Sequence, residues 1–164
     1  MLMKKNILII ALFIGVLVCA VGYSDSQYRT SIGRTAPSLW LSEGDNGISL
    51  NDMRGNYVLL NFWKSTDAPS RRSANDYTAW IRRHPEKDIK YVSVNLDESP
   101  DLFRETVKLD SLIPSTQYHV EGREARAVTD SYGLDDGLGS MLIGPDGKII
   151  AHNPSWDYLN KIKS

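Results

Sequence analysis

The sequence predicts an α/β fold in which a central mixed β-sheet is flanked by helices. Short apolar runs of strand-forming residues alternate with longer segments whose apolar residues recur at three- and four-residue steps. Towards the C-terminus, two short strands joined by a tight turn are followed by one last helix. The composition, with 41% hydrophobic and 24% charged residues, is that of a globular protein, and 164 residues allow one domain plus a targeting segment.

The first 22 residues have the pattern of a secretory signal peptide. Lys4 and Lys5 precede a sixteen-residue apolar run, ILIIALFIGVLVCAVG, and no further charge occurs before Asp25. The small residues at positions 20 and 22 favour cleavage after Gly22. One alternative is an uncleaved membrane anchor, since the run is only slightly short of a membrane span.

A second alternative for this segment is lipidation of Cys19, although Val18 stands where a lipoprotein signal carries a small residue. Residues 23–31 are polar and unpatterned and predict a linker, and residues 32–164 form the predicted domain. Without Lys4 and Lys5 the chain has 17 basic and 20 acidic residues, a net charge of about −3. This balance gives no reason to expect nucleic acid or an anionic membrane surface as a partner.

The domain is expected to open with a loop and a strand, the latter over residues 38–41. A turn over 44–47 and a short helical turn over 49–55, ended by glycine, should follow. The apolar run 58–63 then predicts a buried strand.

A helix is expected to follow this strand at once. Asp67 stands where an N-cap belongs, and Pro69 lies in the first turn, where a missing N–H costs nothing. The helix should run to about Arg83, because Pro85 stops it. Its predicted buried stripe contains Ala74, Tyr77, Trp80, Ile81 and His84. Its predicted solvated face contains Arg71, Arg72, Arg82 and Arg83.

The second half of the chain continues the alternation of strands and helices. Ser99, followed by Pro100, is a predicted N-cap of a helix that runs through Leu109. The other expected elements are strands over 89–97, 114–120, 140–143 and 148–151, and helices over 124–132 and 155–163.

Three stretches resemble one protein family. FWKSTDAPSR, which begins at Phe62, is similar to the FWASWCAPCR signature of the TlpA/ResA-type thiol–disulfide oxidoreductases of the bacterial cell envelope. ISLNDMRGNYVLLNFW and YGLDDGLGSMLIGPDGKII match the segments that usually surround that signature. The resemblance implies a thioredoxin-like fold from about Ile32 to the end, and a place in the periplasm or cell envelope.

The resemblance also shows that the chemistry of the family is missing. The two redox cysteines fall on Asp67 and Ser70 of the segment Asp67-Ala68-Pro69-Ser70, and the only cysteine of the chain is Cys19. A carboxylate cannot be oxidised to a disulfide, and a serine hydroxyl is too weakly acidic to resolve one. We therefore expect no catalytic residue at these positions.

A third departure from the family lies before the strand at 140–143. The family's cis-proline falls on Leu138, and a cis bond before a residue other than proline costs ~2.5–4 kcal/mol. We expect a trans bond in a reshaped loop, with Gly137 and Gly139 supplying any unusual dihedral angles.

Other chemistries find little support in the sequence. His84, His119 and His152 lack the spacing of metal ligands, and nothing in the sequence calls for a cofactor. The acidic pairs at 97–98 and 135–136 are interpreted as solvated loops. Lys64 with Arg71 and Arg72 would suit an anion, but Asp67 already occupies the helix start.

The resulting hypothesis is a redox-inactive module that binds an envelope protein. Its predicted binding surface contains Trp63, Lys64, Asp67 and Leu138. The alternative is a thiol–disulfide oxidoreductase, active in cell redox homeostasis, that uses a thiol supplied in trans or Cys19. A further alternative is a module that only stabilises a larger assembly.

Overall fold

The computed structural model describes residues 30–43 and 46–162. The predicted signal or anchor segment 1–22, including Cys19, lies outside the described residues, as does most of the linker 23–31. Thr30, near the end of that linker, is buried, and its carbonyl oxygen lies 2.7 Å from Nε2 of His152. Among the described residues, no helix combines the length and the apolarity that a membrane crossing needs.

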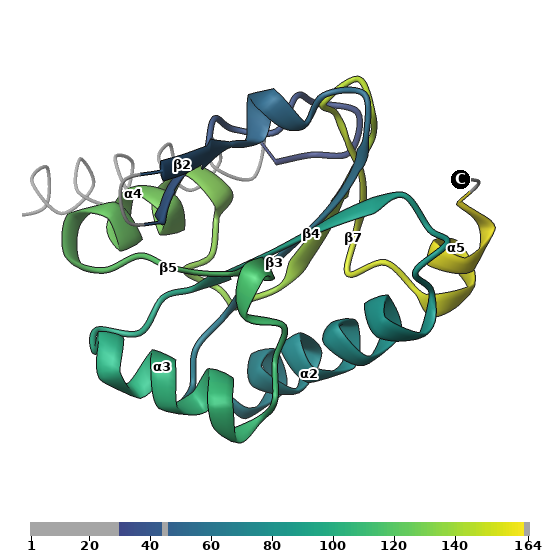
Figure 1. Ribbon diagram of the computed structural model, residues 1–164. Coiled ribbons are helices and arrows are strands. Elements are labelled where there is room, and N and C mark those ends of the chain that lie inside the picture. The colour runs from purple at the N-terminus through teal and green to yellow at the C-terminus, as the bar shows by residue number, and fades with distance from the viewer. Residues whose placement is uncertain (1–29, 44–45, 163–164) are drawn as a thin grey trace, which may run out of the picture.

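The core of the molecule is a five-stranded mixed sheet with the order β5-β4-β3-β6-β7 (Figure 1). Strands β3, β4 and β5 are parallel, whereas β6 and β7 are antiparallel to their neighbours. Their bounds are Tyr57–Trp63, Ile89–Asn95, Gln117–His119, Ser140–Ile143 and Ile149–His152, for β3 to β7 in order. The predicted mixed sheet is therefore confirmed.

Helices and a hairpin cover the two faces of this sheet (Figure 1). Helices α2 (Ala68–Arg83), α3 (Pro100–Leu109) and α5 (Trp156–Lys161) lie on one face. Helix α4 (Gly122–Tyr132) and the hairpin of β1 (Trp40–Glu43) and β2 (Asn46–Ser49) lie on the other. The predicted flanking of the sheet by helices is confirmed.

Strand β3 is buried on both faces. Val58, Leu60 and Phe62 point into the cluster with α4 and the hairpin, whereas Leu59 and Trp63 contact the helices on the other side. This double burial explains why the sequence is almost continuously apolar there.

Asn61, the exception in that run, belongs to a buried polar row. It pairs in register with Ser93 of β4 and Ser140 of β6, and Ser93 pairs with Gln117 of β5. The row separates two apolar clusters on the side of α2, one around Leu59 and one around Trp63.

The N-terminal part of the domain differs from the prediction. The first strand lies about two residues later than 38–41, and the turn expected over 44–47 is wrong at Asn46 and Gly47, which pair in β2. Residues 44 and 45 lie outside the described residues. A glycine is needed at position 47 of this strand because a Cβ there would lie 2.2 Å from a carbon of the Trp40 indole.

The short helical turn expected after this hairpin is confirmed. It is the 3-10 helix η1 (Leu50–Met53), in which the Ser49 hydroxyl accepts a hydrogen bond from Asn51 N at 3.2 Å. Gly55 follows with a φ of 91°, a value that favours glycine.

Helix α2 agrees with its predicted bounds. Ala74, Tyr77 and Trp80 are buried as expected, whereas Ile81 and His84 are only half-buried. The ring of His84 stacks on Trp80 with centroids 4.5 Å apart, so it covers the end of the stripe from outside.

The predicted strand over 114–120 is wrong in its first half. Residues Pro114–Thr116 form the 3-10 helix η2, and Gln117 N donates to Pro114 O. Proline at the first position fixes φ and lacks an N–H, which suits a helical turn better than a strand. Helix α5 buries Leu159 and Ile162 as expected, but Trp156 is 44% exposed and touches Tyr77 at its edge.

Candidate functional site

The candidate site lies where β3 passes into α2. Residues 64–67 connect the two elements, and the loop before β6 lies alongside, because Phe62 N donates to Gly139 O at 3.0 Å. Lys64, Asp67 and Leu138 are thereby brought to the same end of the sheet.

Asp67 caps helix α2. Its carboxylate Oδ1 accepts the N–H of Ser70 at 2.9 Å, and its backbone is extended with φ −96° and ψ 101°. The side chain of Ser70, then the N–H of Ser70 and, to a lesser degree, Lys64 hold the pKa of Asp67 below its ordinary value. Asp67 is thus a fixed anion at a helix N-terminus, where negative charge is favourable.

The Ser70 hydroxyl is fully engaged with the backbone. Ser70 is 3% exposed, and its Oγ donates to Asp67 O and accepts from Lys64 N, each at 3.2 Å. Neither backbone group is a general base, and the nearby Asp67 carboxylate, whose pKa is lowered, is a weak one for activating the hydroxyl as a nucleophile.

Trp63 lies in the interior at the end of β3. Its side chain is 0% exposed and packs on Phe103 of α3, with ring centroids 6.1 Å apart, in a cluster with Ala74, Val107 and Leu112. The expectation that Trp63 contacts a partner is wrong for its side chain, because an apolar ring at this position is covered by two helices. Lys64 is exposed and Asp67 is half-buried.

The Leu138 loop has the expected trans geometry, since the described residues contain no cis peptide bond. Of the two flanking glycines, Gly137 has an unusual dihedral angle, a φ of 149°, and Gly139 has none. Leu138 is half-buried and packs against the core on the side of α4.

Asn153 holds this loop from the end of β7. Its Oδ1 accepts the N–H of Ser140 at 2.9 Å, and its own N–H donates to Ser140 O at 2.8 Å. A glycine suits position 139 because a Cβ there would stand only 3.0 Å from Asn153 Oδ1. The sequence offered no signal for this contact, which joins the first residue of β6 to the residue that follows β7.

Asp97 is buried, contrary to its interpretation as part of a solvated loop. It is 4% exposed, and its carboxylate accepts hydrogen bonds from the N–H and hydroxyl of Ser65 and from Asn95 Nδ2. A buried carboxylate is tolerated because these donors replace its lost water. Asp97 thereby anchors the loop that carries Lys64.

Arg71 also departs from its prediction. Its guanidinium binds both carboxylate oxygens of Asp110 at 2.6 Å, and Asn75 Nδ2 donates to the same carboxylate at 3.1 Å. This pair raises the pKa of Arg71 and lowers that of Asp110. Arg71 therefore clamps α2 to the end of α3, and it is no longer available for an anion at the helix start.

The three histidines lie apart and contact different carbonyl oxygens. His84 Nδ1 lies 2.9 Å from Trp80 O, and His119 Nε2 lies 2.9 Å from Asp97 O. No group of three or more metal-ligating side chains occurs within residues 30–43 and 46–162.

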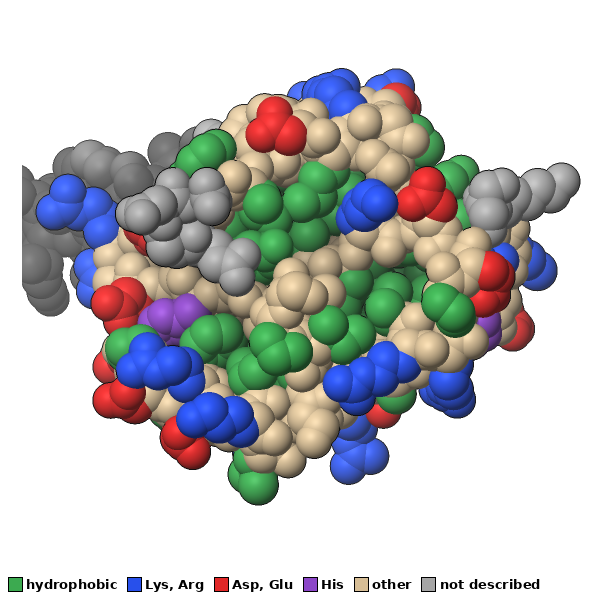
Figure 2. All heavy atoms as spheres, viewed as in Figure 1, with side chains coloured by type: hydrophobic (Ala, Val, Ile, Leu, Met, Phe, Trp, Pro, Cys, Tyr) green, Lys and Arg blue, Asp and Glu red, His purple; other side chains and the backbone are tan. Residues whose placement is uncertain are grey.

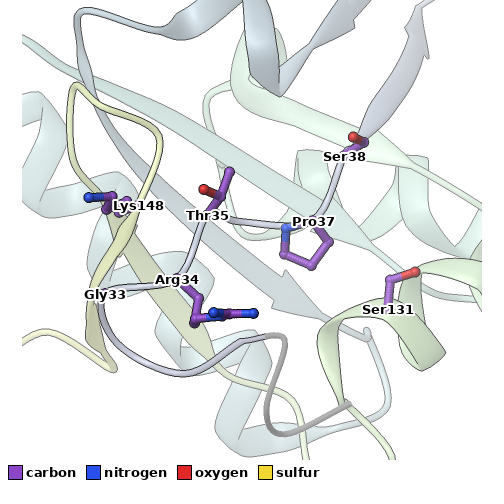
Figure 3. Close-up of a pocket in the computed structure, with 7 residues that line it drawn as sticks. All are labelled: Gly33, Arg34, Thr35, Pro37, Ser38, Ser131 and Lys148. Atoms are coloured by element: carbon purple, nitrogen blue, oxygen red, sulfur yellow. The ribbon is translucent and has the colours of Figure 1, made fainter. Parts of the chain in front are cut away.

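Three clefts of similar size, each with a mixed polar and apolar lining, lie among the described residues. A cleft of about 890 Å³ opens beside Lys64 and Asp97, and one of about 660 Å³ is lined by Leu138 and Asn153. A third, of about 730 Å³, lies between the segment 33–38, Ser131 of α4 and Lys148 (Figure 3). In Figure 3 the side chains of Arg34 and Lys148 extend in opposite directions, so the two cations do not converge on one ligand position.

The strand order, the parallel β3–β4–β5 unit and a helix that follows β3 after a short loop define a thioredoxin-like protein, and the segment from Phe62 to Arg71 resembles the signature of the thiol–disulfide oxidoreductase type. At the two sulfur positions of that type this chain carries Asp67 and Ser70. The chain belongs to the AhpC/TSA family, whose sequence model matches residues 32–152.

Relatives of known name agree with this class. The thiol–disulfide oxidoreductase ResA of Bacillus subtilis (strain 168) is 28% identical over 175 residues, which cover 98% of this chain and 95% of that protein. ResA of Bacillus thuringiensis subsp. konkukian is 26% identical over 156 residues, and the alignment covers 90% of this chain and 88% of that protein.

Solved structures show the same fold. A thioredoxin-like protein from Parabacteroides distasonis has a TM-score of 0.67 and 32% identity, over 80% of this chain and 93% of that one. The thioredoxin domain of a thiol–disulfide oxidoreductase from Bacteroides vulgatus has a TM-score of 0.65 and 25% identity, over 79% of this chain and 92% of that one.

Proposed function

We propose that this chain is an exported, redox-inactive thioredoxin-like module that binds a partner protein in the cell envelope. The binding surface contains Lys64, Asp67 and Leu138, at the end of the sheet where the redox site of the family lies. Lys64 is exposed, and Asp67 and Leu138 are half-buried, so a partner could contact all three. Binding at this surface needs no chemical step.

One observation carries the proposal, and it is the state of the two sulfur positions. Asp67 is a helix cap with a lowered pKa, and the Ser70 hydroxyl is bonded to two backbone groups. No cysteine occurs after Cys19 in the chain. Thiol–disulfide exchange needs a thiolate that attacks a disulfide sulfur, and no residue of the domain supplies one.

Export rests on the pattern of the first 22 residues. The mass of the protein recovered from envelope fractions measures which form exists. Loss of residues 1–22 is the expected result. A mass increase on Cys19 would indicate lipidation instead of cleavage. The full-length chain in the membrane fraction would indicate an uncleaved anchor.

The binding surface is tested by cross-linking and co-purification from envelope extracts. The variant Asp67→Arg/Leu138→Asp should lose the co-purified protein, because it reverses the charge at position 67 and replaces the half-buried apolar side chain at position 138 by a carboxylate. A matched control, Asp76→Arg/Leu109→Asp, changes the same residue types at exposed positions of α2 and α3. Circular dichroism of both variants checks that the fold is intact. A partner retained by the first variant would show that the surface is wrong.

The alternative is an oxidoreductase that uses a thiol supplied in trans or Cys19. It is favoured by the class of its relatives, two of which are thiol–disulfide oxidoreductases by name. Insulin reduction with dithiothreitol, measured for the full chain and for residues 23–164, separates the two functions, because only the full chain retains Cys19. We expect a rate equal to that of a cysteine-free control protein. A clearly higher rate would support the oxidoreductase function instead.

A further inference from the structure

A separate apolar groove follows the outer edge of β5. It has a volume of about 410 Å³ and lies between α3 on one side and Ser42 of β1 on the other. In Figure 2 this region is at the lower left, where hydrophobic and histidine side chains lie together and basic side chains border them. None of Lys64, Asp67 and Leu138 lines it.

Strand β5 is paired along one side only in the part of the chain that the structure describes. It is the last strand of the sheet and pairs with β4 alone among the described residues. Val120 N donates to Asn95 O, so by alternation the backbone groups of Tyr118 also face β4. The carbonyl of Gln117 and both backbone groups of His119 therefore point to the outer side, where an added strand would bind them.

The groove has a firm apolar wall. Phe103 stacks on the ring of His119 with centroids 5.1 Å apart and an interplanar angle of 16°. Buried Trp63 supports Phe103 from behind, and Val107 lies one helical turn further along α3. Such a wall accepts the apolar side chains of an extended segment without having to move.

The charged residues that line the groove are both basic, Arg104 and Lys108. Each forms an ion pair with an acidic residue three positions earlier, Asp101 and Glu105 respectively. All four side chains are more than half exposed, and exposed pairs of this kind contribute only ~0–1 kcal/mol. Both cations therefore remain available to an incoming carboxylate.

We propose that this groove binds an extended, acidic segment of a partner protein, which adds a strand to the free edge of β5. Alternate side chains of the segment would contact Phe103 and Val107, and its carboxylates would pair with Arg104 and Lys108. A second copy of this chain fits less well, because its own β5 (Gln117–His119) contains no acidic residue that could pair with Arg104 and Lys108. The proposal concerns a different surface from that of Lys64, Asp67 and Leu138 and stands without it.

A displayed library of random twelve-residue peptides, selected on the mature chain, tests this proposal. The selected peptides should be enriched in Asp and Glu next to apolar residues, and should shift the amide resonances of residues 117–119 in NMR spectra. Arg104→Glu/Lys108→Glu should weaken their binding at least tenfold in calorimetry. The control Arg83→Glu/Lys161→Glu makes the same charge change at exposed positions and should alter binding less than twofold.

Three results would overturn the proposal. They are a selection that yields no binder, binders without acidic residues, and binders that tolerate Arg104→Glu/Lys108→Glu within twofold while both variants keep the wild-type circular dichroism. Asp67→Arg/Leu138→Asp separates the two surfaces, because it should leave peptide binding unchanged whether or not the first surface has a partner.

Discussion

The carboxylate of Asp67 has an ordinary structural task at an unusual position. It satisfies the N–H of Ser70, one of the groups that a helix start leaves without a partner, and its charge suits the helix dipole. A cysteine thiolate at the same position would also be an anion, but a reactive one. At the scale of one residue, the exchange keeps the charge and removes the sulfur chemistry.

Asp67→Ala should lower the free energy of unfolding by ~0.5–2 kcal/mol at pH 7, as loss of an N-cap does. The folded pKa of Asp67 lies below its ordinary value of 3.8, so its ionised form adds stability above that pH. This stability is lost as the pH falls through the folded pKa. Urea unfolding at pH 7 and at pH 2 measures the difference, which should shrink at the lower pH.

The control for this prediction is Asp76→Ala, an exposed aspartate in the middle of the same helix. It removes a carboxylate but no cap, and alanine favours the helix interior. An equal loss of stability in both variants would mean that the cap contributes nothing specific.

At the scale of elements, the two helices beside the candidate site are joined by side chains from each. Arg71 and Asn75 of α2 both bind Asp110, the residue that ends α3. The geometry is that of a bidentate pair, which holds orientation better than a single contact. Together with the contact of Phe103 on Trp63, this clamp fixes α3 against the start of α2.

Asp110→Ala should destabilise the protein by ~1–2 kcal/mol, because it leaves a partly covered guanidinium without its partner. A double-mutant cycle with Arg71→Ala, followed by urea unfolding, measures the coupling of the two side chains. Arg71 lowers the folded pKa of Asp110, so the coupling should be present at pH 7 and vanish as the pH falls well below 3.8. Coupling that persists at low pH would contradict a charge-based clamp.

At the scale of the whole molecule, a fold can persist after its chemistry is lost because different residues maintain the two. The sheet is held by residues buried on both faces of β3 and β4, and none of them needs a thiol. Asp67 and Ser70 occupy the first turn of α2 without disturbing that core. The function that we propose lies on the surface, where both proposed binding sites are.

Asp67→Cys/Ser70→Cys should restore a disulfide, because the helix start that carried the family's pair is preserved. The thiol at position 67 should have a pKa below the ~8.5 of an ordinary cysteine, since the helix N-terminus stabilises its thiolate. Mass spectrometry after mild oxidation measures the loss of two hydrogens, and thiol labelling against pH measures the pKa. Ser73→Cys/Asp76→Cys, at the same spacing inside α2, is the control and should stay reduced.

Local pattern was sufficient for much of the fold and for part of the site. The sequence of residues 58–70 identified the buried strand and the Asp67 cap, since each depends on neighbours in the chain, whereas the missing sulfur positions followed from the resemblance to the family signature. Trp40 and Gly47 show where the sequence pattern failed. The glycine suggested a turn, but it lies in β2, where it makes room for the Trp40 ring of the paired strand.

By itself, the sequence determined that this chain has a thioredoxin-like frame and no thiol in its domain. Only the tertiary structure decided that Trp63 and Asp97 are buried, that Arg71 belongs to a clamp and that Asn153 holds the Leu138 loop. The physical reason is that the two kinds of feature depend on contacts over different distances along the chain. Caps and strand patterns arise within a few residues, whereas burial and the satisfaction of a charge depend on groups that only folding brings near.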